Sequence, residues 1–397
     1  MTERLYYTDS FLREFDARVL SCAQRPDGRF EVVLDRTAFY PTSGGQPHDL
    51  GRLGEAGITE VYDREADGEI VHIVDGPLPA GPVLGTIDWE RRLDHIQQHT
   101  GQHLLSAAFL KLFHFPTVSF HLGREISTID LDAPSVVPRH MAEAERLANQ
   151  AVCDDRLIRV SFREREEVEK RDVRKLVARE GTLRLVEIEG FDAQPCGGTH
   201  AARTGQVGLI LLRKVERQKG FWRVEFVCGA RAVAAARGDW EALGAAARGI
   251  GCGMAEVPAM VAKMLEERKS AHRDRSWLAG RLAELEAAAL LARIGPAEGG
   301  GTIIHAFDDG DAGFLRQVAA RLAAQAGVRA AIASRSARQF VFARAKDVAG
   351  DMNLALRDVL APAGGKGGGS AEFAQGTAPD AANVDDLLRR ARERLDR

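Results

Sequence analysis

Residues 1–90 carry short runs in which apolar and polar positions alternate. Residues 69–74 alternate and stop at Asp75-Gly76-Pro77, and residues 30–34 follow the turn signal Pro26-Asp27-Gly28. Glycine and proline recur through this region about every ten residues, a spacing typical of small barrels. We therefore predict a small β-barrel over residues 1–90.

The spacing of apolar positions changes after the barrel region. Apolar side chains recur at helical spacing over residues 94–112, with Asp94 as a candidate N-cap, and residues 139–152 predict a second, more polar helix. Two of the strands predicted next are joined by the turn Gln218-Lys219-Gly220. The predicted strands are residues 158–162, 183–188, 207–215 and 221–227. Helices mixed with strands in this way predict an α+β domain over residues 91–235.

Residues 236–295 predict a helical linker or arm. Its clearest part is residues 254–292, where every seventh residue is apolar: Val257, Met264, Ala271, Leu278, Leu285 and Ala292. Arg268 and Arg275 interrupt the companion positions of this heptad pattern. Two interpretations stay open: a helical hairpin or coiled-coil arm, which could pair between chains or fold back, and an amphipathic linker helix packed on its own chain. A glycine-rich linker follows at residues 295–301.

Residues 301–397 predict a third, α/β unit. Its predicted strands are residues 302–306, 329–333 and 339–343, and its helices are residues 312–326, 351–360 and a terminal helix from about residue 384. A glycine loop is predicted at residues 364–369. The whole chain is therefore predicted to be an α+β protein, with a barrel, a mixed domain, a helical arm and a glycine-rich α/β domain.

Composition narrows the class of protein. The 397 residues fit two or three domains, and the 45% hydrophobic content excludes wholesale disorder. The sequence contains no uninterrupted apolar run of about 18 residues, so no membrane span is predicted. The N-terminus has no secretory pattern, and the odd count of five cysteines argues against a disulfide framework, so we expect a cytoplasmic protein with reduced thiols.

Charge is distributed unevenly along the chain. The net charge of −3 argues against a nucleic-acid partner when it is taken over the whole sequence. Residues 312–378, however, hold nine Lys and Arg against four acidic residues, a net charge of +5. A positive segment beside a glycine loop suits phosphate groups, because Lys366 and bare backbone N–H groups can approach them closely. The alternative is a flexible glycine connector on a solvated face.

Two residue pairs have the spacing of metal ligands. His99 and His103 are four apart on a predicted helix, so both imidazoles lie on one face. Cys196 and His200 flank Gly197-Gly198, which allow a tight loop. Three imidazoles and one thiolate suit Zn²⁺. Thr100 stands where a zinc protease has its glutamate base, which excludes that class. The sequence is compatible with a structural zinc that has four protein ligands and with a catalytic zinc that keeps one coordination position for substrate.

The segment at residues 36–49 is the other unusual feature. It combines two aromatic residues, Phe39 and Tyr40, with a Gly-Gly turn and short polar side chains. By composition alone, a stabilising turn with both aromatic residues in the core is favoured. The functional interpretation is a pocket wall in which Thr37 and Gln46 supply hydrogen bonds.

These motifs, taken together and in order, resemble a known family. Thr37-Ala38-Phe39-Tyr40-Pro41 with Ser43-Gly44-Gly45-Gln46, the run from Asp94 to Ala107, Ser119–Gly123 with Ser127–Leu131, and Cys196–His200 resemble the editing domain of alanyl-tRNA synthetase and, more closely, the free-standing AlaX-type trans-editing proteins. Residues 301–397, with Gly364–Gly369, resemble the glycine-rich C-terminal domain shared by alanyl-tRNA synthetases and DHH phosphoesterases. Together these suggest the long form of AlaX. The resemblance begins almost at Met1, so no synthetase core and no ATP-dependent aminoacylation are expected.

The resemblance implies an aminoacyl-tRNA deacylase that hydrolyses seryl-tRNA(Ala), with glycyl-tRNA(Ala) as a further candidate substrate. By residue matching, His99, His103, Cys196 and His200 are the implied zinc ligands, and Thr37 and Gln46 line the amino-acid pocket. In the C-terminal domain, Lys366, Gly365 and Gly367 are the expected tRNA contacts. A homodimer through the arm or the C-terminal domain is a further expectation. No general base stands out, and His95 is interpreted as a packing residue.

Three other functions are considered. A DHH-type phosphoesterase needs a DHH motif, but Asp94-His95 is followed by Ile96. A zinc-containing tRNA-binding protein without catalysis is disfavoured because Thr37, Gln46 and all four ligands are present. A threonyl-type editing hydrolase would share the ligand pattern, but the loop at residues 37–46 and the C-terminal domain favour the alanine system.

Overall fold

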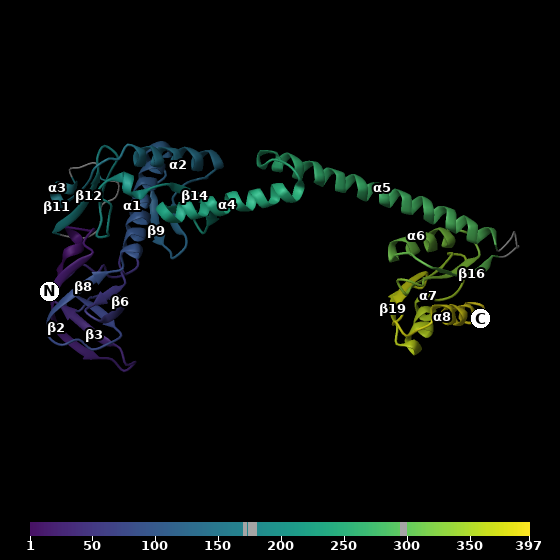
Figure 1. The fold of residues 1–397 in the computed structure, drawn as a ribbon. Helices are drawn as coiled ribbons and strands as arrows, with labels where there is room; N and C mark the ends of the chain where they lie inside the picture. Colours follow the sequence, from purple (N-terminus) through teal and green to yellow (C-terminus); the bar gives the residue numbers. More distant parts are fainter. Residues whose placement is uncertain (170–172, 174–180, 294–299) are drawn as a thin grey trace. The chain divides into compact units, whose positions relative to one another are not determined.

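The computed structural model describes the chain except for residues 170–172, 174–180 and 294–299, so the predicted linker at residues 295–301 lies largely outside the described residues. The chain forms two compact units, Met1–Ala245 and Ala246–Arg397, and the boundary along the sequence falls within helix α4 (Gly229–Ile250). Figure 1 labels the elements of both units. None of the helices in the described parts is long and apolar enough to cross a bilayer.

The first unit opens with the predicted barrel. Six strands close in the order β2-β3-β7-β6-β5-β8, with neighbouring strands antiparallel. Their bounds are β2 Glu14–Gln24, β3 Phe30–Leu34, β5 Gly51–Leu53, β6 Ala56–Arg64, β7 Glu69–Val74 and β8 Gly81–Ile87. The alternating apolar positions fill the interior, where Leu34, Leu53 and Ile70 are fully buried.

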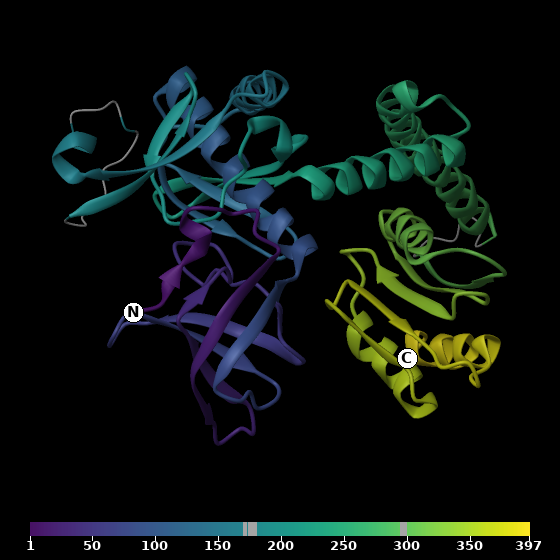
Figure 2. The same ribbon diagram turned by 60° about the vertical axis from the view of Figure 1, so that its left-hand side comes forward.

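A short parallel ribbon fixes the start of the chain beside the barrel. β1 (Glu3–Arg4) pairs with β4 (Arg36–Thr37), and the 3₁₀ turn η1 (Leu5–Tyr7) follows β1. Figure 2 shows the N-terminus beside the barrel strands. This pairing holds the beginning of the unusual 36–49 segment in place.

Helix α1 (Trp89–Phe113) begins earlier than its sequence pattern predicted. The predicted N-cap Asp94 is wrong: the N-cap is Asp88, whose side chain accepts the Arg91 N–H. Trp89 and Leu93 continue the helical spacing back from Ile96, so the sequence carries a sign of this first turn that the prediction did not use. The helix ends at His114, which adopts a left-handed conformation (φ 57°).

Helices α1 and α2 (Pro138–Cys153) share a core with the antiparallel sheet β14-β15-β10-β9. The hairpin of β14 (Ile210–Gln218) and β15 (Phe221–Cys228) is confirmed, but β14 starts after the predicted residue 207 because η2 (Thr204–Val207) is a 3₁₀ turn. β9 (Thr117–Leu122) and β10 (Ser127–Leu131) complete that sheet. A second antiparallel sheet has the order β11-β12-β13. Its elements are β11 Ile158–Glu164, β12 Thr182–Ile188 and β13 Asp192–Pro195, with the short helix α3 (Arg165–Glu169) after β11.

After the end of α4, the second unit continues with the 3₁₀ turn η3 (Met254–Glu256) and the 36-residue helix α5 (Val257–Ala292), which confirms the helix predicted over residues 254–292. Near its C-terminal end, Ala283, Ala287 and Leu290 pack in a core shared with α6. Many other apolar side chains of the stripe are exposed within the unit, among them Val261, Met264, Leu278, Leu282 and Leu285. Pairing of two chains through this stripe stays a prediction.

A five-stranded sheet, β16-β17-β18-β20-β19, forms the centre of the second unit. α5 and α6 share a core with one face, and α7 and α8 share a core with the other. The bounds are β16 Gly301–Phe307, α6 Ala312–Ala323, β17 Val328–Ser334, β18 Gln339–Arg344, α7 Met352–Leu360, η4 Ala361–Ala363, β19 Lys366–Gly369, β20 Phe373–Thr377 and α8 Val384–Leu395. The predicted helix at residues 312–326 ends at Ala323, three residues early.

The predicted glycine loop at residues 364–369 is wrong, because Lys366–Gly369 form the edge strand β19, paired with β20. Helix α7 explains the glycines. A Cβ on Gly367 would lie 2.7 Å from Leu356 Cδ2, and one on Gly365 would lie 3.0 Å from Leu360 Cβ, both on α7. Glycine therefore lets α7 pack closely on this strand.

A fully buried ion pair joins α1 to the segment at residues 38–49. Arg92 Nε donates to Asp49 Oδ1 at 3.0 Å, and its other nitrogens donate to the carboxylate and to the Ala38 and Ser10 carbonyl oxygens. Asp49 also accepts the Tyr40 N–H at 2.6 Å. Both side chains have no exposed surface. Every charge here is therefore paired or hydrogen-bonded, which a buried charge requires.

We expect Asp49→Asn to lower the free energy of unfolding by about 3–5 kcal/mol, because it leaves the Arg92 guanidinium buried without a countercharge. Urea unfolding followed by circular dichroism measures the change. Glu143→Gln, which breaks the exposed Arg139–Glu143 pair, is the control and should cost about 0.5 kcal/mol or less. Equal effects of the two substitutions would contradict the role of the buried pair.

The glycines of β19 give a matched test of α7 packing. Gly367→Ala should destabilise the protein by about 1–3 kcal/mol, because the added methyl overlaps Leu356. Gly368→Ala should be tolerated, since the nearest atom to a Cβ there is 4.0 Å away. Thermal unfolding of both variants tests this difference, and similar midpoints would contradict it.

Candidate metal and substrate site

Four side chains that the sequence singled out converge in the first unit. His99 and His103 come from α1, and Cys196 and His200 come from the loop after β13. One ligand atom from each lies within 4.8 Å of all the others. The Cys196 thiol sulfur is 3.4 Å from His99 Nε2 and 3.2 Å from His200 Nε2. The loop passes so close to α1 that a Cβ on Gly198 would lie 2.1 Å from the His99 ring.

Each imidazole of this cluster is held from outside through its Nδ1 atom. His99 Nδ1 lies 2.7 Å from Gln46 Oε1, His103 Nδ1 lies 3.3 Å from an Asp192 carboxylate oxygen, and His200 Nδ1 lies 3.3 Å from Thr100 Oγ1. A metal ion bound at Nε2 requires the proton on Nδ1, and these three oxygens lie close enough to Nδ1 to orient the rings for that state.

The electrostatics of the cluster suit metal binding. Burial alone would raise the pKa of the Cys196 thiol, but His99 and His200, with hydrogen bonds from His103 and His200, hold that pKa well below its usual value. Burial, with the neighbouring histidines, lowers the pKa of His200 to about 3, so its imidazole is neutral at pH 7. A thiolate and neutral imidazoles are the protonation states in which these groups bind metals. The four residues therefore fit a metal ion.

A cavity of about 430 Å³ opens beside the cluster. His99, His103 and Cys196 reach its wall, but His200 does not. The ring of Phe120 on β9 stands 5.3 Å from the His99 ring and forms another part of the wall. The remaining lining residues are Tyr40, Ser43, Gly44, Gln102, Thr117, Val118, Ser119, Gln194, Pro195, Gly197 and Gly198. One side of the cluster is therefore open to a bound molecule.

Gln46 and Thr37 are fully buried, and neither is among the residues that line this cavity. Gln46 supports the cluster instead: its Oε1 accepts the Thr199 N–H and faces His99, and its Nε2 donates to Thr199 Oγ1 at 2.9 Å. The Thr37 hydroxyl lies in the barrel, 2.8 Å from His72 Nε2, and accepts the Phe39 N–H. Burial lowers the pKa of His72 to about 4, so this imidazole is neutral.

Two further residues of the 36–49 segment divide between core and cavity. Phe39 is fully buried in the barrel core, as the turn interpretation predicted, whereas Tyr40 lines the cavity and donates its hydroxyl to the Ser43 carbonyl oxygen. His95 is buried on α1 outside the cavity lining, and burial lowers its pKa to about 3. The interpretation of His95 as a packing residue agrees with this position.

Sequence reasoning missed Gln102 and Asp192. Gln102 lines the cavity from α1, and its position three residues after His99 places it on the helix face of the ligands. That spacing could have identified it. Asp192 lies on β13 and reaches His103 only through the fold, so no local pattern marks it.

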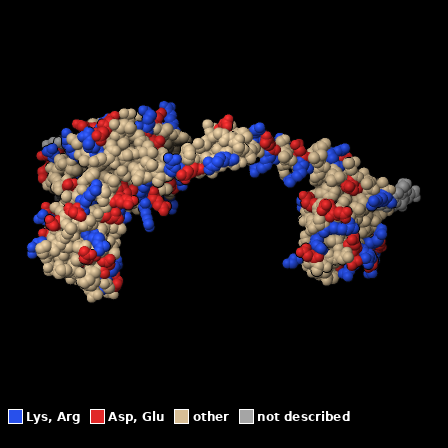
Figure 3. Space-filling model, in the orientation of Figure 1, with Lys and Arg blue, Asp and Glu red and all other residues tan. Residues whose placement is uncertain are grey.

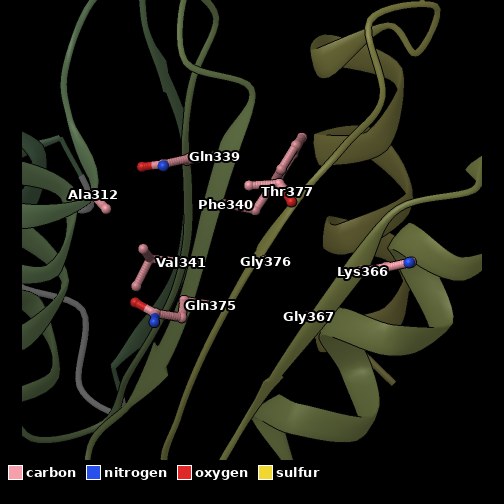
Figure 4. A pocket seen from close by; sticks show the side chains of 9 residues that line it. All are labelled: Ala312, Gln339, Phe340, Val341, Lys366, Gly367, Gln375, Gly376 and Thr377. Atoms are coloured by element: carbon pink, nitrogen blue, oxygen red, sulfur yellow. The ribbon is translucent and has the colours of Figure 1, made fainter. Parts of the chain in front are cut away.

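In the second unit, Lys366 and Gly367 line a separate cavity of about 290 Å³. Figure 4 shows Gln339, Val341 and Gln375 on one side of the sheet, with the Lys366 side chain pointing away from them. Lys366 is exposed, and the described residues offer it no carboxylate within ion-pair distance. On the face of this unit that Figure 3 shows, basic and acidic side chains are interspersed.

Two known families match parts of this chain. Residues 183–225, which include Cys196 and His200, match the threonyl and alanyl tRNA synthetase second additional domain, and residues 299–397 match the DHHA1 domain. Among solved structures, the C-Ala domain of Aquifex aeolicus alanyl-tRNA synthetase is 25% identical and covers 25% of this chain and 97% of that one, with a TM-score of 0.22.

Curated relatives extend the similarity over the whole chain. The alanyl-tRNA editing protein AlaX-L of Pyrococcus horikoshii is 39% identical over 243 residues, which is 59% of each chain. Alanine–tRNA ligases of Pyrococcus abyssi and Halobacterium salinarum are 32% and 35% identical over 98% and 99% of this chain, but over only 43% and 44% of their own length. The chain thus spans about half the length of the curated relatives it matches. It is an AlaX-L-like protein, related to alanyl-tRNA editing proteins and to the editing and C-terminal DHHA1 domains of alanyl-tRNA synthetases.

Proposed function

We propose that this protein is a trans-editing hydrolase that removes serine from mischarged seryl-tRNA(Ala), with glycyl-tRNA(Ala) as a further substrate. The open cavity beside the three histidines and Cys196 carries this proposal. Similarity to the AlaX-L protein of Pyrococcus horikoshii supports the assignment to alanyl-tRNA editing. In the reaction, a water oxygen bonds to the ester carbonyl carbon, the bond from that carbon to the ribose oxygen breaks, and the ribose oxygen takes up a proton.

We further propose that His99, His103, Cys196 and His200 hold Zn²⁺. Three imidazole nitrogens and one thiolate are a common zinc ligand set. When bound, zinc supplies Lewis-acid polarisation at the reaction centre. The outer partners Gln46, Asp192 and Thr100 keep the imidazoles oriented for this role.

The residues of the cavity then bind and orient the aminoacyl ester. Its described lining contains no aspartate or glutamate, so no carboxylate stands ready there as a general base. An aminoacyl ester is already activated toward water, so correct positioning contributes a large part of the rate. Phe120 and Tyr40 supply apolar surface that restricts bulk water around the ester.

For the C-terminal unit we propose contact with the tRNA backbone through Lys366. The side chain is exposed and lies at the edge strand, where an RNA backbone can approach it. Gly365 and Gly367 contribute by keeping β19 close to α7, which fixes the position of Lys366. Serine-charged or glycine-charged tRNA(Ala) is the proposed partner.

Deacylation of purified Ser-, Gly- and Ala-tRNA(Ala), with metal analysis by plasma mass spectrometry, tests the catalytic proposal. We expect about one zinc per chain and release of serine much faster than of alanine. Cys196→Ala should lose the metal and at least a hundredfold of the rate, in line with loss of a group that stabilises the transition state.

Cys153→Ser is the matched control, since Cys153 is exposed and outside the cluster. It should keep both zinc and activity. A metal-free Cys196→Ala protein that deacylates at the normal rate would refute the zinc role. Seryl-tRNA(Thr) is assayed as a fourth substrate, and activity on it alone would favour a threonyl-type hydrolase. Zinc binding without deacylation of any of the four substrates would favour a non-catalytic tRNA-binding protein.

Lys366→Ala should weaken tRNA binding and reduce the slope of log K against log salt by about 0.7–0.9, the contribution of one phosphate contact. Fluorescence anisotropy at several salt concentrations measures both quantities. Arg394→Ala is the control, because Arg394 lies in the same unit but pairs with Asp358. An unchanged salt slope for Lys366→Ala would remove it from the interface.

A further inference from the structure

Selection of serine over alanine requires a polar atom that is still free to bind the serine hydroxyl. A buried group built for that hydroxyl is left unpaired when alanine binds, and this is the source of discrimination. The Thr37 hydroxyl already contacts His72 Nε2 and accepts the Phe39 N–H. Gln46 uses its amide on His99 and Thr199. Neither side chain therefore has a free buried polar atom with which to select serine over alanine.

Gln102 has such an atom. Its side chain lines the cavity between His99 and His103 and is 2% exposed. Its Oε1 is buried and has no hydrogen-bond partner in the described parts of the chain. A buried acceptor without a donor is unfavourable, so its presence beside a ligand cavity points to a donor that arrives with the ligand.

A hydrogen-bond chain fixes which end of the Gln102 amide is free. Gln102 Nε2 donates to Ser106 Oγ at 2.8 Å, one turn further along α1. The Thr117 hydroxyl on β9 also donates to Ser106 Oγ, at 2.7 Å. Since Ser106 Oγ receives both donors, the amide nitrogen is committed and the oxygen is the atom left over.

Two other hydroxyls of the cavity wall already donate hydrogen bonds within the protein, so neither is left unsatisfied when the cavity is empty. Ser119 Oγ donates to Asp130 at 2.6 Å, and the Tyr40 hydroxyl donates to the Ser43 carbonyl oxygen at 3.2 Å. A serine hydroxyl that enters the cavity brings one O–H donor. Gln102 Oε1 is an acceptor of the cavity wall that is buried and has no hydrogen-bond partner among the described residues, so it is the acceptor that gains most from this donor.

We propose that Gln102 is a specificity-determining residue, whose Oε1 accepts the hydrogen bond of the serine hydroxyl in the seryl ester. The inference rests on the proposed deacylase function and adds the residue that distinguishes its substrates. Alanine offers no donor to this oxygen, so its ester leaves Gln102 unpaired. Glycine gains nothing from Gln102, so its hydrolysis is independent of the amide.

Gln102→Leu tests the proposal, because leucine has similar bulk and no acceptor. We expect kcat/KM for Ser-tRNA(Ala) to fall about tenfold relative to the values for Gly- and Ala-tRNA(Ala), the worth of one neutral hydrogen bond, because the acceptor that distinguishes the substrates is gone. Zinc content should match that of the unsubstituted protein. Ser106→Ala, which releases the amide nitrogen, should give a smaller loss in the same direction and serves if Gln102→Leu does not fold.

Gln98→Leu is the matched control. Gln98 is a buried glutamine on the same helix, but its amide is bound to the Cys228 backbone and lies outside the cavity lining. It should lower thermal stability without changing the ratio of serine to alanine hydrolysis. If Gln102→Leu lowers the rates on all three substrates equally, or lowers none, the proposal is wrong.

Binding gives a readout that does not depend on turnover. Amide-linked seryl-adenosine, which is not an ester, should raise the unfolding temperature of the unsubstituted protein more than its alanyl counterpart does. In Gln102→Leu this difference should vanish, and its persistence would overturn the proposal. If the unsubstituted protein hydrolyses none of the three tRNAs, the proposed function itself fails, which is distinct from an active enzyme that ignores Gln102.

Discussion

The buried pair of Arg92 and Asp49 determines how the site is assembled. Arg92 precedes His99 by seven residues on α1, which is close to two helical turns. Arg92 and the two histidines of the cluster therefore lie along one side of the helix. Asp49 fixes the end of the loop whose residue Gln46 contacts His99. Helix α1 therefore binds the loop through the Arg92–Asp49 pair and places His99 against Gln46 of the same loop. The barrel and the helix are thus joined at the site itself.

How far the sequence predicts this arrangement depends on the range of each contact. The spacing of His99 and His103 and that of Cys196 and His200 predicted the cluster, because each pair is local and only its meeting with the other is not. The role of Gln46 depends on a contact across 53 residues with His99, and the burial of Thr37 depends on His72, 35 residues away. No pattern in the chain encodes such partners, so the contacts of Gln46 with the cluster and of Thr37 with His72 cannot be predicted from the sequence.

The glycine-rich strand shows the same limit in another form. A run of glycines in a sequence predicts a flexible loop, because the sequence shows only the conformational freedom of glycine and not the atoms that surround it. In the fold, Gly365 and Gly367 are required by the close approach of α7, whereas Gly368 meets nothing nearer than 4.0 Å. Residues of one type in one motif thus serve different needs, and only the surrounding atoms distinguish them.

The hydrogen bonds of the polar side chains distinguish residues that support the cluster from a residue that could recognise a substrate. Gln46, Thr100 and Asp192 direct their polar atoms at the histidines, so a change in any of them acts on the cluster before it acts on a substrate. Gln102 lies one position from His103, yet its amide nitrogen is bound to Ser106 and its oxygen to no described group. His200 does not line the cavity while the other three cluster residues do, so the cluster joins α1 to the β13 loop on one side and faces the cavity on the other. A compact cluster and an open cavity are thus compatible in this fold, because they occupy opposite sides of the same four side chains.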